Sequence, residues 1–425
     1  MTQNRYAQNP ALFKLALYCE GLRISEEALK ALNASREIMR TRAGLGSGLE
    51  LVLPGGLWTN APVTESFCAA SPFELEYEDR GFLVRHRDGQ AVPVEPAPRP
   101  SWYGWQCATG KPMRHVGTLQ GTYLGIFPTK VCEFWTNPTK ENCKYCSVGL
   151  NLGQDDAPEK TVDEVLEVVQ TARRVSGITY VDFNTGHHED ESYLDALEPL
   201  VRAVKQKTGL LVGIQTPPHS NLSRYDRLKD IGVNRVSFCF EQYDPEKFAE
   251  VCPGKHRYYG LDRYLETMAY CASLGKKQRL LEPWVTNGEV IAGLEPPEST
   301  IAAIEHIASC GAIPTVCVFR PLKGTQYSRL EPPKTEAMVP VFRHLYEACI
   351  KHGLPIGLAP NIHVSLVMLP EECSWLSPLR RSPGFRLKAV KLQVKKALFR
   401  GVFNLKLRKF DRALTPISPE RQSPL

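Results

Sequence analysis

The chain contains 425 residues, of which 43% are hydrophobic and 23% are charged, as in an ordinary globular protein with a substantial core. This length predicts two or three structural units. No apolar run approaches the length of a membrane-spanning helix, and the first ten residues lack a signal-peptide pattern. Thirteen cysteines without an export signal favour a reducing, cytoplasmic environment over a disulfide framework.

The net charge of +6 is concentrated near the C-terminus. Residues 377–425 contain thirteen Lys and Arg against two acidic residues, so this tail carries +11 and the remainder of the chain carries −5. The excess of positive charge lies in the tail alone, so we expect no nucleic-acid partner for the main body.

Residues 1–120 are predicted to form a small α+β module, which we expect to close the mouth of the domain that follows. Residues 44–48 read GLGSG, which is neither a phosphate loop nor a dinucleotide fingerprint, so we interpret them as a mobile loop. Trp102 and Trp105 are expected to dock a proline-rich connector over residues 93–100. Apolar periodicity predicts helices at 11–20 and 25–32 and an antiparallel sheet built from 73–77, 82–87 and 91–94.

Residues 121–353 repeat a strand–loop–helix pattern six times. The first helix opens at Thr161 with a capping box that ends in Glu164. Six such units predict a parallel sheet with right-handed crossovers, bent into a partial, TIM-like (β/α)6 barrel, an α/β fold. The chemistry of such a sheet lies at the carboxyl ends of its strands. The strands are predicted at 123–128, 179–184, 210–215, 235–240, 287–293 and 314–319.

Three cysteines follow the first predicted strand of the barrel. Cys132, Cys143 and Cys146 have C-x10-C-x2-C spacing. A closed structural zinc site needs four ligands, whereas three thiolates suit a 4Fe–4S cluster with one open iron. A zinc knuckle that takes its fourth ligand from elsewhere is the alternative.

An aromatic residue, Tyr145, comes directly before the last cysteine. The loop therefore resembles the cluster loop of the radical S-adenosylmethionine (radical SAM) superfamily, whose usual spacing is C-x3-C-x2-C. The resemblance implies that S-adenosylmethionine (SAM) and a 4Fe–4S cluster are the cofactors.

The second strand ends in Asn-Thr-Gly-His-His, where radical SAM proteins have a Gly-Gly-Glu-like turn that meets the amino group of SAM. The resemblance implies that backbone carbonyls around Thr185 and Gly186 would do this here. His187 and His188 are adjacent on an extended turn and should point apart, so we interpret them as poor metal ligands.

Three further strand-end residues are candidate contacts of SAM or substrate. Gln215 ends the third strand and could face the barrel mouth or act as a polar cap. Glu241 ends the fourth strand and suits a hydroxyl-rich ribose or a polar substrate. Lys255 lies in a Pro-Gly-Lys sequence and suits a carboxylate, with a solvated surface charge as the alternative.

The fifth and sixth strands resemble the biotin-synthase-like branch of this superfamily. Residues 291–295 resemble its Ile-x-Gly-x-x-Glu motif, with the acid one residue early, and residues 321–325 resemble its Pro-x-x-Gly-Thr turn. The resemblance implies that Gly293 and Gly324 let the backbone approach the nucleoside. The elongated cysteine spacing, C-x(8–10)-C-x2-C, is most similar to an uncharacterised bacterial family found beside nitrilase-like genes.

The resemblance also implies the reaction. One electron, from a donor such as ferredoxin or flavodoxin, would cleave SAM, and the 5′-deoxyadenosyl radical would take hydrogen from a small-molecule substrate. A sulfur-inserting enzyme with a second cluster at Cys239 and Cys317 is one alternative, although free cysteines are commonly buried small hydrophobes. A non-catalytic zinc-binding module is the other.

Residues 354–425 are predicted to form a C-terminal extension with a basic amphipathic helix. Apolar residues in this helix recur every three or four positions and form a stripe on one side of it. Two interpretations are open: the stripe packs on the barrel, or it lies on an anionic membrane as a peripheral contact. We expect packing, because valines and Gly401 weaken an isolated helix. The stripe consists of Leu387, Val390, Val394, Leu398, Val402 and Leu405.

Overall fold

The computed structural model describes residues 4–32, 48–276 and 282–412. The predicted mobile loop at 44–48 lies outside these residues except for Gly48, which opens a strand.

The described residues of the N-terminal module form three helices and a six-stranded sheet with the order β1-β4-β5-β6-β2-β3. The predicted antiparallel sheet is confirmed as β4, β5 and β6. The β2–β3 hairpin was not predicted. The elements are α1 (Arg5–Gln8), α2 (Pro10–Glu20), β1 (Arg23–Ile24), α3 (Glu26–Ala31), β2 (Gly48–Leu53), β3 (Leu57–Pro62), β4 (Phe73–Glu78), β5 (Gly81–His86) and β6 (Ala91–Pro96).

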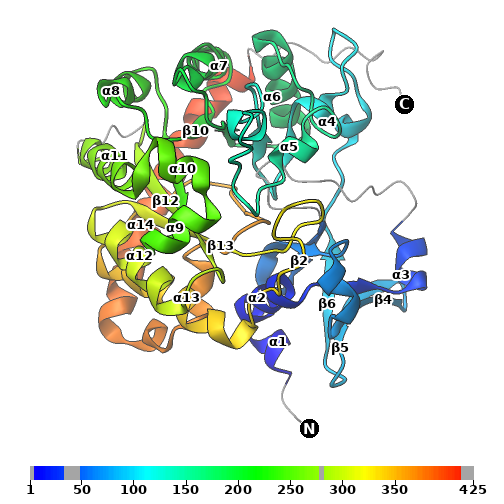
Figure 1. The fold of residues 1–425 in the computed structure, drawn as a ribbon. Helices are drawn as coiled ribbons and strands as arrows, with labels where there is room; N and C mark the ends of the chain where they lie inside the picture. The colour runs from blue at the N-terminus through cyan, green and yellow to red at the C-terminus, as the bar shows by residue number, and fades with distance from the viewer. Residues whose placement is uncertain (1–3, 33–47, 277–281, 413–425) are drawn as a thin grey trace.

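The second sheet has seven strands in the order β13-β12-β11-β10-β9-β8-β7. Strands β8 to β13 are parallel and follow one another in sequence, which confirms the six predicted units, while β7 pairs antiparallel with β8. The sheet is curled into a partial barrel with helices outside it (Figure 1). Its strands are β7 (Thr118–Leu119), β8 (Leu124–Ile126), β9 (Tyr180–Asn184), β10 (Leu211–Gln215), β11 (Arg235–Glu241), β12 (Val285–Ala292) and β13 (Ile313–Val318).

Local sequence signals explain where the barrel helices begin. The predicted capping box is present at α6, because Thr161 accepts from the backbone of Glu164 and the Glu164 carboxylate accepts from the backbone of Thr161. The helices are α4 (Met113–Val116), α5 (Val148–Asn151), α6 (Val162–Ser176), α7 (Tyr193–Thr208), α8 (Ser223–Asp230), α9 (Pro245–Val251), α10 (Pro253–Tyr258), α11 (Gly260–Leu274), α12 (Pro297–Ser309), α13 (Thr335–Lys351) and α14 (Pro383–Asp411).

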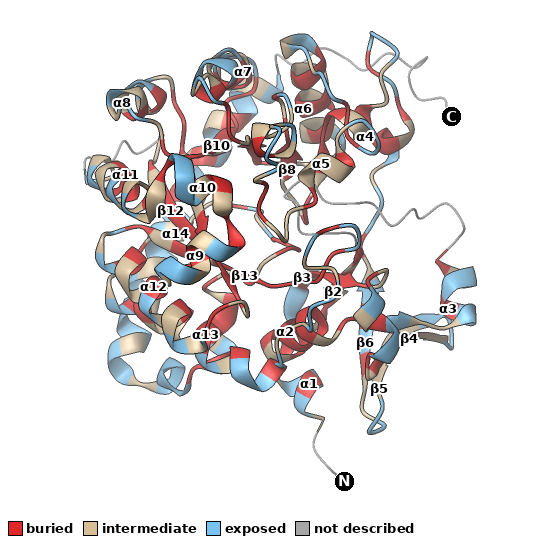
Figure 2. Cartoon of the chain, in the orientation of Figure 1, coloured by how far each residue is buried: buried red, intermediate tan, exposed pale blue. Residues whose placement is uncertain are grey.

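The barrel strands are buried on both faces, as is usual for a parallel sheet covered by helices (Figure 2). All five residues of β9 are buried. The two predicted docking residues, Trp102 and Trp105, are also buried.

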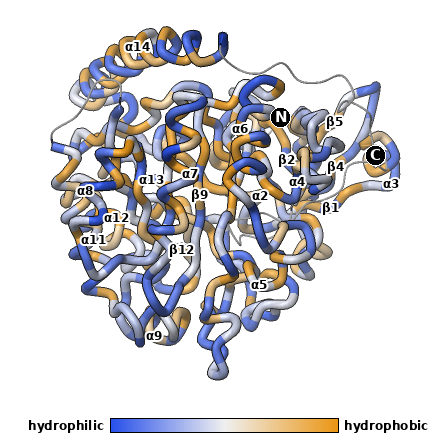
Figure 3. Tube along the Cα trace, turned by 90° about the horizontal axis from the view of Figure 1, so that it is seen from above, coloured by the Kyte–Doolittle hydropathy of each residue, from blue (hydrophilic) through white to orange (hydrophobic). Residues whose placement is uncertain are grey.

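The C-terminal helix α14 lies along one end of the barrel, opposite α5 and α9 (Figure 3). Its packed side chains are Phe399, Phe403 and Leu407. The predicted stripe is on the other side of the helix, where Val402 is half-buried and the remaining five members are more than half exposed. Our expectation that this stripe packs on the barrel was therefore wrong, because α14 carries a second apolar face with larger aromatic side chains.

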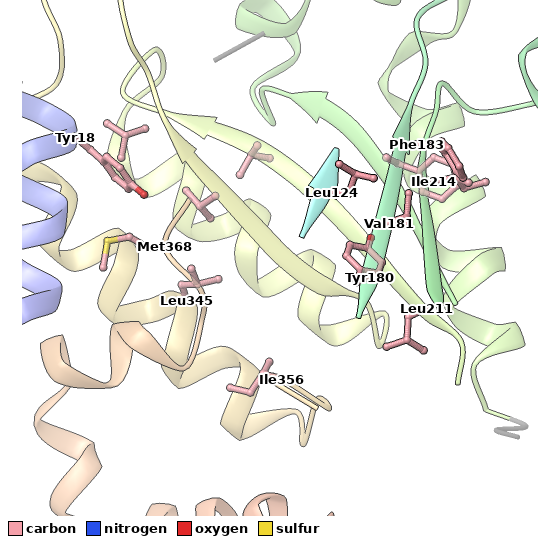
Figure 4. Close-up of a cluster of buried hydrophobic side chains, with 14 of the residues drawn as sticks. Tyr18, Leu124, Tyr180, Val181, Phe183, Leu211, Ile214, Leu345, Ile356 and Met368 are labelled. Atoms are coloured by element: carbon pink, nitrogen blue, oxygen red, sulfur yellow. The ribbon is translucent and has the colours of Figure 1, made fainter. Parts of the chain in front are cut away.

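The N-terminal module packs against the chain that follows α13. The buried ammonium of Lys14 in α2 donates to the Val364 carbonyl (2.9 Å) and to Glu372 (2.8 Å), and the backbone N–H of Asn60 donates to Ser365 (2.7 Å). Gly121 bridges to Val364, so this segment joins the β7–β8 hairpin to the module. One hydrophobic cluster contains Tyr18 of α2, Leu345 of α13 and Met368, together with β9 and β10 (Figure 4).

The module thus covers the open side of the barrel beside β13. It touches the mouth at the loop after β13, where Arg320 donates to Asn60 and the backbone N–H of Lys323 donates to Glu65. Our expectation that the module closes the mouth remains a prediction.

Candidate active site

The cysteine loop lies beyond the carboxyl ends of β8, β9 and β11. The backbone N–H of Glu133 donates to the His187 carbonyl (2.9 Å), and that of Lys144 donates to the Val251 carbonyl (3.0 Å). Phe134 stacks on the His187 ring at 4.0 Å. These contacts fix both halves of the loop to the turns that follow β9 and β11.

The three predicted cysteines lie near one another. Burial raises the pKa of Cys146 to about 12, with further contributions from Cys143 and Cys132. The backbone N–H of His187 donates to the Cys132 sulfur (3.3 Å), and that of Val148 donates to the Cys146 sulfur (3.5 Å). Backbone donors aimed at sulfur stabilise the thiolate form that iron binds.

Within the described part of the chain, no three His, Cys, Asp or Glu side chains are grouped closely enough to hold one metal ion. Thiolates on a single zinc ion stand about 4 Å apart, because each Zn–S bond is about 2.3 Å long. The cysteines of a 4Fe–4S cluster bind separate irons and stand farther apart. Cys132, Cys143 and Cys146 supply three thiolates, which is the donor set of a 4Fe–4S cluster with one open iron.

Gly186 packs directly on Cys132. A Cβ added at Gly186 would lie 2.6 Å from the Cys132 Cα, so no side chain fits there. Thr185 donates from its backbone N–H to the Gln215 carbonyl (2.9 Å). The two residues assigned to the SAM turn therefore stand between a cluster cysteine and the end of β10.

The two histidines of this turn have separate partners, as predicted. His187 hydrogen bonds with Tyr259, and His188 hydrogen bonds with Ser192 (3.1 Å). Burial lowers the pKa of both, and that of His187 falls to about 4. A neutral, stacked His187 supports the cysteine loop through its ring and its backbone N–H.

Glu241 and Lys255 form a buried ion pair (2.6 Å). Lys255 also donates to the Cys239 carbonyl (2.6 Å), and Glu241 has φ +70° at a register shift in β11. Burial lowers the pKa of Lys255, but the Glu241 carboxylate, Tyr264 and nearby thiols raise it well above its usual value. The surface-charge interpretation of Lys255 was wrong, because the ammonium is held inside the barrel mouth.

Gly293 and Gly324 both have positive φ, +105° and +85°. A Cβ at Gly293 would lie 2.7 Å from Pro333, and one at Gly324 would lie 2.8 Å from Leu150. Each glycine therefore permits a tight turn against a neighbouring side chain, and their approach to a nucleoside stays a prediction.

A cavity of about 490 Å³ runs inside the barrel. It reaches from Tyr145 of the cysteine loop, past Gln215 and Glu241, to Phe399 of α14. Residues 355–371 supply much of its wall. The cavity therefore connects the cysteine loop with the opposite end of the barrel.

Comparisons with known proteins agree with this geometry. A profile of the radical SAM superfamily matches residues 139–295. The match includes Cys143 and Cys146 and begins after Cys132, so geometry alone brings Cys132 to the site. The matched part of the chain therefore has the sequence of a radical SAM region. The match implies SAM and a 4Fe–4S cluster as the cofactors.

Bacteriochlorophyllide c C-7(1)-hydroxylase from Chlorobaculum limnaeum is 26% identical over 272 residues, 59% of this chain. The match spans 66% of the hydroxylase, just under two thirds of its length. Methylornithine synthase (PylB) gives a TM-score of 0.41 at 14% identity and covers 66% of this chain and 85% of its own. The hydrogenase maturase HydG gives 0.41 at 14%, covering 60% of this chain and 54% of its own.

Two buried acceptors of the barrel lack a hydrogen-bond partner in the described part of the chain. Asn184 Oδ1, at the end of β9, and Gln242 Oε1, after β11, have no hydrogen-bond partner among the described residues. A buried acceptor without a donor is unfavourable by about 1–3 kcal/mol.

Sequence reasoning missed two features of the candidate site. Cys252 is buried, and its hydrogen bond with Cys143 lowers the pKa of Cys143. Asp182 and Arg235 meet Glu289 inside the cavity. The sequence did carry a signal for the second feature, because these charged residues lie within otherwise apolar parallel strands.

The contact between Gly186 and Cys132 predicts a strong local effect. We expect Gly186→Ala to displace Cys132 and to lower the iron bound per chain several-fold, as measured after anaerobic reconstitution. Gly104→Ala is the matched control, because nothing lies within 4 Å of a Cβ added there. Equal iron content in both variants would contradict the placement of Cys132 beside Gly186.

Proposed function

We propose that this enzyme removes a hydrogen atom from an unactivated C–H bond of a small organic substrate bound in the barrel cavity. When bound, the cluster and SAM supply the 5′-deoxyadenosyl radical, after one electron from a donor such as ferredoxin or flavodoxin. The chain supplies the position of the substrate and the exclusion of water. The observation that carries the proposal is a cavity that begins at the cysteine loop and is lined by the barrel strands and by residues 355–371.

A polar layer in the middle of the cavity supports substrate binding there. Arg235 donates to Asp182 (3.1 Å) and to Glu289. Glu289 also accepts from Gln215 Nε2 (2.8 Å) and from Ser237. Burial lowers the pKa of Arg235, but Tyr180, Asp182 and Glu289 together raise it well above its usual value, so the guanidinium keeps its charge. Such a layer, held by four strands, can orient polar groups of a substrate while its C–H bond faces the cluster.

The similarity to a bacteriochlorophyllide hydroxylase supports chemistry at a C–H bond. We extend the proposal to the biotin-synthase-like branch and to the bacterial family with elongated cysteine spacing. The tight turns at Gly293 and Gly324, both with positive φ, support this closer assignment.

A sulfur-inserting reaction is the second candidate, because Cys239 and Cys317 both line the cavity. The Cys239 thiol donates to Glu289 (3.2 Å). A second cluster would raise the iron content from about four to about six to eight atoms per chain. An iron and sulfide assay therefore distinguishes the two candidates.

The test of hydrogen abstraction uses a fully deuterated metabolite extract. We expect anaerobic incubation with SAM, a reductant and the extract to raise 5′-deoxyadenosine above the uncoupled background and to place deuterium in it. An increase in 5′-deoxyadenosine that carries no deuterium would contradict hydrogen abstraction from the substrate.

The polar layer is tested with Glu289→Gln. Loss of a hydrogen-bonded charge should reduce the extract-dependent increment by about tenfold or more, while iron content and uncoupled cleavage persist. Glu198→Gln is the matched control, since Glu198 pairs with Arg202 and Arg227 on α7 and α8, outside the cavity. If Glu289→Gln keeps the full extract-dependent increase in 5′-deoxyadenosine, the polar layer does not take part in substrate binding.

A further inference from the structure

We propose that the outer face of α14 is a docking surface for an anionic lipid membrane. This face is the exposed apolar stripe of the helix together with the cations beside it.

The stripe is a continuous apolar surface. Eleven large hydrophobic side chains are exposed among the described residues, and five of them belong to α14. Their spacings of three, four, four and seven place them on one side of a helix. Scattered exposed apolar residues are normal, but a contiguous row marks an interaction site. The five are Leu387 (60% exposed), Val390 (59%), Val394 (55%), Leu398 (65%) and Leu405 (61%).

Cations lie along both edges of the stripe. Helical spacing places Lys391, Lys395 and Lys409 on one edge and Arg386 on the other, and all four are exposed. Long basic side chains can keep their charge at lipid phosphates while their methylene stems lie along an apolar surface. The pattern is that of a helix lying in the interface plane of a membrane.

The other side of α14 holds the helix on the barrel. Phe399 and Phe403 stack at 5.6 Å and are buried, and Asp411 pairs with Arg173 (2.8 Å). Lys406 pairs with Glu282. The stripe is therefore not required to anchor the helix and is presented outward by it.

Charge favours a membrane over a second copy of the chain as the occupant. The helix carries nine Lys and Arg and one acidic residue, Asp411. Stripe-to-stripe pairing of two copies would bring both cationic borders together, whereas anionic lipid attracts each of them. None of the described helices is long and apolar enough to cross a membrane, so the contact is with the surface.

The position of α14 gives the docking a consequence. Gln393, Lys396, Phe399 and Arg400 line the end of the barrel cavity that is farthest from the cysteine loop. Docking through the outer face of α14 places this end of the cavity next to the lipid.

The test is co-sedimentation of the full, iron-loaded chain with phosphatidylcholine vesicles, with and without phosphatidylglycerol. We expect pelleting with the anionic vesicles, falling several-fold with neutral vesicles or high salt. The Val394→Glu/Leu398→Glu double variant should bind at least tenfold more weakly. Leu330→Glu is its matched control, because Leu330 is 46% exposed and lies outside α14. Lys391→Gln and Lys395→Gln should each weaken binding about fivefold.

Iron content and uncoupled SAM cleavage should be unchanged in all of these variants, which shows that the fold is intact. Equal pelleting of the wild type and the double variant would overturn the proposal. Absence of vesicle binding together with a dimer mass in light scattering, lost in the double variant, would overturn it in favour of a second copy as the occupant.

Discussion

We expect Cys143→Ala to lose the brown colour of the cluster and nearly all cleavage of SAM. Cys143 is buried between the turn after β8 and α9, and one missing ligand leaves an iron of the cube without its thiolate. The three cysteines act as a unit, so the loss should approach that of the triple variant. Iron content, visible absorption and 5′-deoxyadenosine formation measure the effect.

The matched controls are Cys107→Ala and Cys373→Ala, two buried cysteines outside the loop. Both should keep the cluster. Cys252 contacts Cys143 and could replace it as a ligand, so Cys143→Ala/Cys252→Ala completes the series. Full iron content and SAM cleavage in this double variant would show that Cys143 is not a ligand.

The second large effect concerns the attachment of the N-terminal module. We expect Lys14→Met to lower the free energy of unfolding by about 3–5 kcal/mol, because it leaves the Glu372 carboxylate without its cation in a buried site. Lys14 is fully buried, and it joins α2 to the segment that lines the cavity. Denaturant unfolding measures the change.

Lys247→Met is the control for Lys14→Met. Lys247 and Glu250 also form an ion pair at 2.7 Å, but both side chains are more than 40% exposed, so the expected loss is below about 1 kcal/mol. The Lys14→Met/Glu372→Gln double variant should recover part of the loss, since no charge then remains buried. Equal effects of Lys14→Met and Lys247→Met would contradict a structural role for the buried pair.

The barrel was predictable because each strand is a short apolar run followed by a capped amphipathic helix. Helix ends such as Thr161 were placed correctly from side-chain chemistry alone. The β2–β3 hairpin was missed because Pro54-Gly55-Gly56 and the adjoining glycines look like a loop. Residues 355–371 have no period, so nothing in their sequence shows that they line the cavity.

The candidate site was predictable only in part. Spacing pointed to Cys143 and Cys146, which lie close together in sequence, and to Cys132, and the ligand role of all three stays a prediction. The partners of Lys255 could not be predicted, because the Cys239 carbonyl and the Glu241 carboxylate come within hydrogen-bond distance of it only in the folded chain. Periodicity likewise could not show which of the two apolar faces of α14 packs, since only tertiary contacts select Phe399 and Phe403 over the stripe.

The most direct test of the central claim is the wild-type protein itself, purified anaerobically and assayed for iron, sulfide and SAM cleavage. We predict about four iron and four sulfide per chain, as in one 4Fe–4S cluster, with 5′-deoxyadenosine and methionine formed from SAM on addition of a reductant. Protein that binds zinc, or that binds four iron atoms and leaves SAM intact under reducing conditions, would contradict the account.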